Sequence, residues 1–174
     1  SAHGSFMELG QVSGDNPWPP GGEGWQNTPR SPIVRNIRQV AILVNDLDQA
    51  VEDFNRMFGI TPSRQAELTA FGLKAAYIPF GDGETVIEFL QPIRPDSAGA
   101  RFLAERGEGP YLLIFEVYDF EKAVEQVQAN GGRITQANRQ GEFHSAWVHP
   151  LSTGGVFVQL SKPTGENPWP PAGA

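Results

Sequence analysis

The chain has 174 residues, 39% of them hydrophobic and 19% charged, a balance typical of a soluble globular protein. Its formal net charge of −7 at pH 7 argues against binding to nucleic acid, and no apolar run approaches the roughly 18 residues of a membrane-spanning helix. The absence of cysteine excludes disulfides, thiolate catalysis and cysteine-ligated metals, and it fits a cytoplasmic location.

The two ends of the chain differ in composition from its centre. Residues 1–7 are interpreted as the remnant of an expression tag, which leaves His144 and His149 as the histidines available for chemistry. Residues 8–34 form a Pro/Gly/Trp-rich arm, and the tail, residues 163–174, repeats its Asn-Pro-Trp-Pro-Pro motif. The repeat predicts either two polyproline-II arms whose tryptophans dock in grooves, on this chain or a partner, or two flexible tails.

Between the arms the chain contains a larger internal repeat. Residues 39–44 and 112–117 are β-branched, strand-like segments, and each precedes an acidic turn and an amphipathic helix that stops at glycine. A shift of 73 positions superimposes Val44 on Val117. The sequence therefore predicts a first β-α-β-β-β module at 35–93, a linker with a short helix at 94–108, and a second module at 109–162.

Further strands are expected after each predicted helix. In the first module they span 73–80 and 85–90, joined by a hairpin turn at 81–83. In the second module they span 145–149 and 155–160. One more irregular strand is expected within each of the segments 61–72 and 133–144.

Paired β-α-β-β-β modules resemble the vicinal oxygen chelate superfamily of glyoxalases, bleomycin-resistance proteins and extradiol dioxygenases. Within this superfamily the sequence is most similar to the methylmalonyl-CoA epimerase branch, and the similarity is carried by segments 40–47, 102–109 and 149–156. The resemblance covers residues 35–162 and implies an α+β fold, in which the paired modules form a curved open sheet around a cleft. It also implies a homodimer, for which the terminal arms are candidates for exchange between subunits.

The resemblance places the four metal-ligand positions of those epimerases at Gln39, Glu88, Leu112 and Gln159. A catalytic divalent ion needs imidazole or carboxylate at most of its positions. Leu112 cannot ligate a metal, the two amides are weak ligands, and Glu88 is the only strong ligand. The expectation is therefore a cleft with no metal and no other cofactor.

Two glutamates are candidates for catalysis. Strand alternation places Glu116 on the face that also carries Leu112, so that it points toward the same cleft as Glu88. Two such acids, with Gln39 and Gln159 as amide donors, would abstract a proton next to a carbonyl and hold the enolate. Alternatively, Glu88 only hydrogen-bonds an amide, and Glu116 pairs with Arg35, Arg38 or Lys74.

The remaining candidates lie around the predicted cleft. His144 enters a strand near the cleft mouth and is either a proton shuttle or a surface residue. Tyr77 and Tyr111 are candidate donors to a substrate oxyanion, or packing residues. Trp147, with Leu112, is expected to contact an apolar ligand.

Two functions follow from these residues. The first is a metal-independent isomerase, epimerase or lyase that transfers a proton beside the carbonyl of a small hydrophobic or acyl substrate. The second is a non-catalytic protein that binds or sequesters a ligand in the same cleft.

Overall fold

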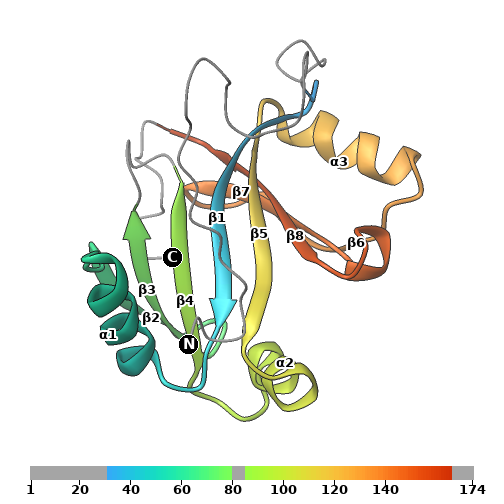
Figure 1. Ribbon diagram of the computed structural model, residues 1–174. Coiled ribbons are helices and arrows are strands. Elements are labelled where there is room, and N and C mark those ends of the chain that lie inside the picture. Colours follow the sequence, from blue (N-terminus) through green and yellow to red (C-terminus); the bar gives the residue numbers. More distant parts are fainter. Residues whose placement is uncertain (1–30, 80–84, 166–174) are drawn as a thin grey trace, which may run out of the picture.

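The described residues fold into one open eight-stranded sheet with three α-helices (Figure 1). The computed structural model describes residues 31–79 and 85–165. The predicted terminal arms, apart from 31–34 and 163–165, and the hairpin turn at 81–83 lie outside the described residues. No helix in the described ranges is long and apolar enough to cross a membrane.

Each half of the described chain follows the order strand, helix and three strands, as the sequence predicts. The first half consists of β1 (Val34–Leu43), α1 (Leu47–Phe58), β2 (Arg64–Leu68), β3 (Leu73–Pro79) and β4 (Val86–Pro92). The connecting helix is α2 (Ala98–Arg106). The second half consists of β5 (Gly109–Val117), α3 (Phe120–Ala129), β6 (Ile134–Asn138), β7 (Phe143–Val148), a 3-10 turn (Pro150–Ser152) and β8 (Phe157–Pro163).

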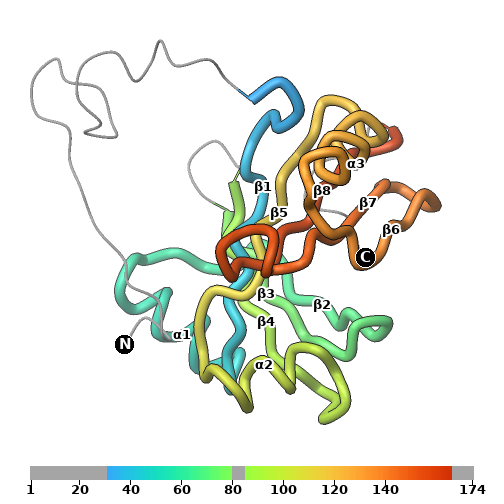
Figure 2. The backbone as a smooth tube through the Cα atoms, turned by 90° about the vertical axis from the view of Figure 1, so that its right-hand side faces the viewer, coloured from blue at the N-terminus to red at the C-terminus, as the bar shows by residue number. Residues whose placement is uncertain are grey.

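The strand order is β2-β3-β4-β1-β5-β8-β7-β6, so the two halves meet at the antiparallel pair β1–β5. On either side of this pair the same pattern repeats, because β4 runs parallel to β1 and β8 runs parallel to β5. Figure 2 shows the outermost strands β2 and β6 on the same side of the central pair, as expected of a curved sheet. The predicted α+β fold with a curved open sheet is confirmed.

Local sequence signals explain where the helices begin and end. The side chain of Asp46 accepts a hydrogen bond from the backbone N–H of Gln49 at the start of α1, and α1 ends at Gly59 with a left-handed φ of 65°. Asp119, 73 positions after Asp46, caps α3 in the same way. Helix α3 ends at Ala129 with Asn130 as its cap, so its cap lies one residue before the expected glycine pair.

Alternating side chains divide the hydrophobic residues between the two faces of the sheet. Outward-facing residues of the first half pack under α1, with Phe54 at the centre, and those of the second half pack under α3 around Phe120. The inner face carries a separate cluster that includes Ala41, Leu112 and Ile114. Helix α2 packs closely on this inner face, because a Cβ added at Gly99 would lie 3.0 Å from a methyl of Leu73. The outer face therefore holds α1 and α3, and the inner face, on which α2 packs, is left to form a cavity.

The helix cap at Asp46 provides a test of this local analysis. We expect Asp46→Ala to lower the free energy of unfolding by about 1 kcal/mol, because it removes the side-chain acceptor of the Gln49 N–H. The matched control is Asp48→Ala in the first turn of the same helix, which loses only a favourable dipole interaction of about 0.3–0.5 kcal/mol. Urea unfolding followed by circular dichroism measures both, and equal losses would contradict the assignment of the cap.

Candidate functional site

A cavity of about 700 Å³ lies on the inner face of the sheet, between the two halves. Its walls come from both halves, since Glu88 and Gln39 line it from β4 and β1, and Gln159 and Trp147 line it from β8 and β7. Most of the exposed wall surface is apolar, although ten of the 23 described wall residues are Gln, Asn, Glu, Ser or Thr. This combination is typical of small-molecule sites in proteins.

Glu88 is the buried ionisable group of this cavity. Its side chain is 4% exposed, and one carboxylate oxygen, Oε2, accepts a hydrogen bond from Nε2 of Gln39 at 3.1 Å. The hydroxyl of Tyr77, directly opposite on β3, donates a second hydrogen bond to the carboxylate. Burial disfavours the charged form and outweighs both hydrogen bonds, so the pKa of Glu88 rises to about 7. Glu88 is thus poised to exchange a proton at neutral pH.

The register of the strands assembles this group. Glu88 lies opposite Ala41 on the parallel strand β1, one inward-facing position after Gln39. Small Ala41 leaves room for the Gln39 amide to reach diagonally to the carboxylate. Tyr77 stays protonated at neutral pH, because burial and the neighbouring Glu88 charge raise its pKa. Sequence alternation predicts that these side chains share a face, but the contact of Tyr77 with Glu88 follows from the β3–β4 register.

The second half of the cavity carries the pseudo-symmetric counterpart. Gln159 lies opposite Ile114, the position that corresponds to Ala41 under the 73-residue shift, so Gln159 matches Glu88. Its Nε2 donates to Oγ of Ser161 at 2.8 Å and to Oγ of Ser145 at 3.3 Å. Sequence analysis did not single out either serine. The only available signal was their inward position in strands that are otherwise apolar.

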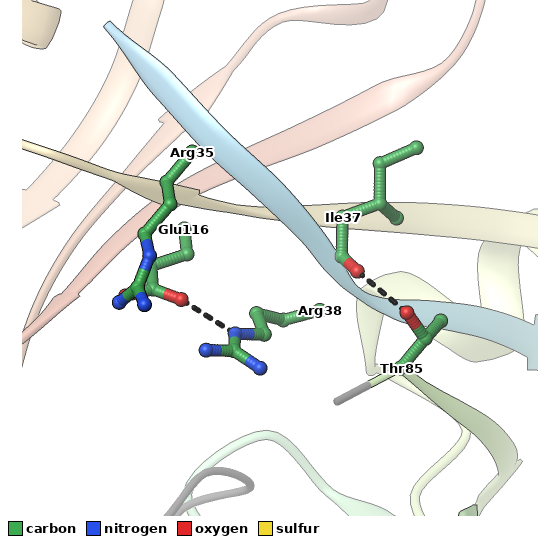
Figure 3. Close-up of polar contacts among 5 residues, drawn as sticks. All are labelled: Arg35, Ile37, Arg38, Thr85 and Glu116. Carbon is green, nitrogen blue, oxygen red and sulfur yellow. Dashed lines mark hydrogen bonds and ion pairs between the residues drawn. The ribbon is translucent and has the colours of Figure 1, made fainter. Parts of the chain in front are cut away.

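Glu116 does not line the cavity, which corrects the expectation that it acts there with Glu88; it forms instead the ion pair with Arg35 and Arg38 that the sequence offers as the alternative. It accepts hydrogen bonds from Arg35 Nη1 at 2.8 Å and from Arg38 Nε at 2.5 Å (Figure 3). An irregularity in the β1–β5 register between Ile37 and Gln39 leaves Arg38 as the extra residue, which lets Arg38 reach Glu116. Although burial favours the neutral acid, the two guanidinium groups lower the pKa of Glu116 below its ordinary value. The group is an ion-pair cluster beside the cavity.

His144 also lies away from the cavity. Its ring packs edge-to-face against Phe120 of α3, with ring centroids 5.4 Å apart, because position 144 points to the outer face of β7. The neighbouring Phe143 and Ser145 point inward and line the cavity. The predicted position of His144 at the cleft mouth is therefore corrected by the alternation of β7, and its ring is on the wrong side of the sheet for proton transfer in the cavity.

The other predicted binding residues line the cavity. Tyr111, Leu112 and Trp147 are among its wall residues. The Tyr111 ring contacts Phe157 at 5.9 Å between centroids, and Trp147 faces Phe71 at 6.4 Å. These rings form an aromatic wall next to the second half of the sheet. Trp18 and Trp169 of the arms lie outside the described residues.

The residues at the expected metal-ligand positions do not fit a divalent metal ion. Leu112 has no donor atom, and the neutral amide oxygens of Gln39 and Gln159 are weaker ligands than imidazole or carboxylate. Glu88 is the one carboxylate of the set. Across residues 31–79 and 85–165, no three His, Cys, Asp or Glu side chains gather in a way that could hold a metal. The donor set therefore does not fit a catalytic divalent metal ion.

Replacement of each buried glutamate by glutamine is expected to change the free energy of unfolding at pH 8 in opposite directions. Since the pKa of Glu88 is about 7 in the native state and 4.5 ordinarily, the native state binds more protons than the unfolded chain between these values. Its contribution to stability thus falls as the pH rises from about 4.5 to about 7. We expect Glu88→Gln to raise the free energy of unfolding at pH 8 by roughly 2–4 kcal/mol, and to change it little at pH 5.

Glu116→Gln is the matched control for this prediction. The lowered pKa of Glu116 means that its stabilising contribution is present above its ordinary pKa and is lost as the pH falls. At pH 8 the amide would remove the negative charge that pairs with Arg38, so we expect Glu116→Gln to lower the free energy of unfolding. Urea unfolding at pH 5 and pH 8 measures both variants. A loss of stability for Glu88→Gln at pH 8 would contradict the raised pKa.

Comparison with known proteins agrees with this architecture. Residues 38–148 match the family described as the Glyoxalase/Bleomycin resistance protein/Dioxygenase superfamily. The uncharacterized protein YqjC of Bacillus subtilis (strain 168) is 24% identical over 139 residues, which cover 76% of this chain and 96% of that protein.

Solved structures share the fold. Methylmalonyl-CoA epimerase of Mycobacterium tuberculosis superimposes with a TM-score of 0.70 at 24% identity, covering 81% of this chain and 97% of that one. The Streptomyces coelicolor epimerase bound to 2-nitronate-propionyl-CoA gives 0.67 at 24% identity, covering 76% and 99%. With the match of residues 38–148 to the family, the chain belongs to the glyoxalase, bleomycin-resistance protein and dioxygenase superfamily.

Proposed function

We propose that the protein is a metal-independent isomerase, epimerase or lyase that moves a proton beside the carbonyl of a small hydrophobic or acyl substrate. The observation that carries the proposal is Glu88, a fully buried carboxyl in the cavity wall whose pKa is raised to about 7. A general base is most effective when its pKa lies close to the working pH. Strongly shifted groups in cavities are also typical of functional sites.

In the proposed reaction the ionised Glu88 takes a proton from the carbon next to the substrate carbonyl. The electron pair of the broken C–H bond moves onto the carbonyl oxygen and forms an enolate. Glu88 can return the proton only to the face from which it took it, so an epimer forms when the enolate turns over in the cavity or takes a solvent proton on its other face. Return of the proton at another carbon gives an isomer. Expulsion of a leaving group from the β carbon instead gives a lyase product.

The neighbours of Glu88 suit this sequence of steps. The Gln39 amide holds Oε2 and so orients the carboxylate toward the cavity. The Tyr77 hydroxyl donates to Glu88 while the carboxylate is charged, and its raised pKa keeps it protonated. Once Glu88 holds the substrate proton, the same hydroxyl is free to donate to the enolate oxygen. The Tyr77 hydroxyl would therefore stabilise the negative charge first on Glu88 and then on the enolate oxygen.

The fold similarity to methylmalonyl-CoA epimerases supports an isomerase-type reaction. The alternative is a protein that binds a ligand without turnover. The observation in its favour is the aromatic wall of Tyr111, Trp147 and Phe157, which provides contact area without chemistry. The two proposals differ in whether Glu88 controls a rate.

We also infer a homodimer, because β2 and β6 are the outer strands of the sheet and each leaves one edge for another chain or segment. The terminal arms at 8–34 and 163–174 are proposed to cover such edges, within one chain or by exchange. Light scattering of the full chain should give about twice the 19.0 kDa of one copy. A monomeric mass would contradict the dimer.

Deuterium exchange tests the proposed reaction. EDTA-treated protein in deuterated water is incubated with acyl-CoA thioesters and small aromatic ketones, and mass spectrometry follows deuterium uptake beside the carbonyl. We expect uptake that survives EDTA, rises with pH through about 7, and falls at least 100-fold in Glu88→Gln.

Glu116→Gln is the control, because this glutamate is also buried but lies outside the cavity, and it should keep its exchange activity. Equal uptake by Glu88→Gln and the parent chain would overturn the assignment of the base. Binding of a ketone without uptake would favour the ligand-binding protein.

A further inference from the structure

A cluster of neutral polar side chains lies in the cavity wall of the second half, away from Glu88. It consists of Ser145, Ser161 and Gln159, all of which line the cavity. Ser161 is 1% exposed and Ser145 is 7% exposed, and their hydroxyl oxygens are 3.0 Å apart. The cluster holds no charge. It stands at the position that Glu88 occupies in the first half of the molecule.

Not every polar atom of the cluster has a hydrogen-bond partner. The Gln159 amide donates to both serines, and one serine donates to the other. Three of the four polar hydrogens are therefore used within the cluster. In the described parts of the chain, neither the remaining hydroxyl hydrogen nor Oε1 of Gln159 has a partner of its own. Buried polar groups normally find hydrogen-bond partners, so one donor and one acceptor are left to face the cavity.

The charges around the cavity restrict what can bind there. Among the described wall residues the acidic groups are Glu88 and Glu142, and none is lysine or arginine. The nearby Arg35 and Arg38 are paired with Glu116, outside the cavity. A ligand carboxylate would enter an apolar space with acidic groups and no cation, at a high desolvation cost. A neutral ligand meets no such cost.

The spacing of the strands sets the distance that a ligand must span to contact both Glu88 and Gln159. Glu88 on β4 and Gln159 on β8 are separated by three strand spacings, roughly 14 Å along the sheet. Both side chains extend into the cavity and shorten this gap. The aromatic side chains of Tyr111, Trp147 and Phe157 line the second half of the cavity. A small molecule with an apolar body and polar groups at both ends would fit.

We propose that the cavity takes an uncharged, largely apolar molecule whose amide-like group, a neutral donor next to an acceptor, is held by Ser145, Ser161 and Gln159. Its carbonyl end then lies toward Glu88. The hydroxyl hydrogen donates to the ligand acceptor, and Oε1 of Gln159 accepts from the ligand donor. The inference that this ligand is a substrate rests on the proposed function. The inference that it binds at the cluster is independent of that function. The cluster disfavours molecules with a free carboxylate.

Binding of three matched probes tests this assignment. The full chain, labelled with ¹⁵N, is titrated at pH 8 with 3-phenylpropanamide, 4-phenyl-2-butanone and 3-phenylpropanoate, and the side-chain amide signals of Gln159 are followed by NMR. We expect the amide to bind at least tenfold more tightly than the carboxylate and to shift the Gln159 signals. The ketone has a hydrogen-bond acceptor but no donor, so its affinity should lie between those of the amide and the carboxylate.

Variants locate the contact. Ser161→Ala and Ser145→Ala should each weaken amide binding about fivefold, the effect of one neutral hydrogen bond, while the carboxylate is unaffected. Ser152→Ala is the control, because Ser152 lines a separate pocket next to α3 and not this cavity. The dispersion of the NMR spectrum verifies that each variant is folded.

Three results would overturn the inference. They are carboxylate binding as tight as amide binding, amide binding that neither serine variant weakens, and no amide binding at millimolar concentration. Amide binding as expected, with no deuterium exchange on any carbonyl probe, would overturn the proposed proton transfer and leave the binding site standing. The two proposals therefore fail separately.

Discussion

The antiparallel pairing of β1 with β5 is the interaction on which the rest of the structure depends. It joins two modules that each have only one helix on one face of four strands, too little to enclose a cavity alone. The pair places Gln39 beside Ile114, and through β4 and β8 it sets Glu88 and Gln159 on opposite walls. A register slip of one residue would turn these side chains to the helix-covered face. The site therefore exists only when the two modules are joined in this register.

The two buried glutamates show how position determines the chemistry of one residue type. Glu88 has only neutral partners, an amide and a phenol, so burial prevails and its pKa rises to about 7. Glu116 is buried to a similar extent, yet two guanidinium groups offset the cost of burial and lower its pKa. The first carboxyl can exchange a proton near neutral pH. The second is a fixed charge that ties the start of β1 to β5.

The internal repeat has kept its architecture while its site residues have diverged. Asp46 and Asp119 cap their helices with the same geometry, and Ala50 and Ala123 are both fully buried under them. At the cavity, by contrast, Glu88 corresponds to a neutral glutamine with two serine partners. One half thus offers an ionisable carboxyl and the other a neutral hydrogen-bonding group. A symmetric fold in this way supplies an asymmetric cavity, which a substrate with two different ends requires.

The sequence by itself determined the two-module fold, because hydrophobic periodicity, acidic helix starts and a 73-residue repeat are local or pairwise signals. The resemblance to the epimerases pointed to Glu88 as a metal-ligand position, and the cost of an acid on an apolar strand made it a candidate base. The tertiary structure decided the rest. Alternation alone could not decide whether Glu116 would face the cavity or pair with Arg35 and Arg38, nor show that His144 would face Phe120. The serine cluster also depended on the pairing of β7 with β8, because hydrogen bonds between distant segments follow from register and no local pattern encodes them.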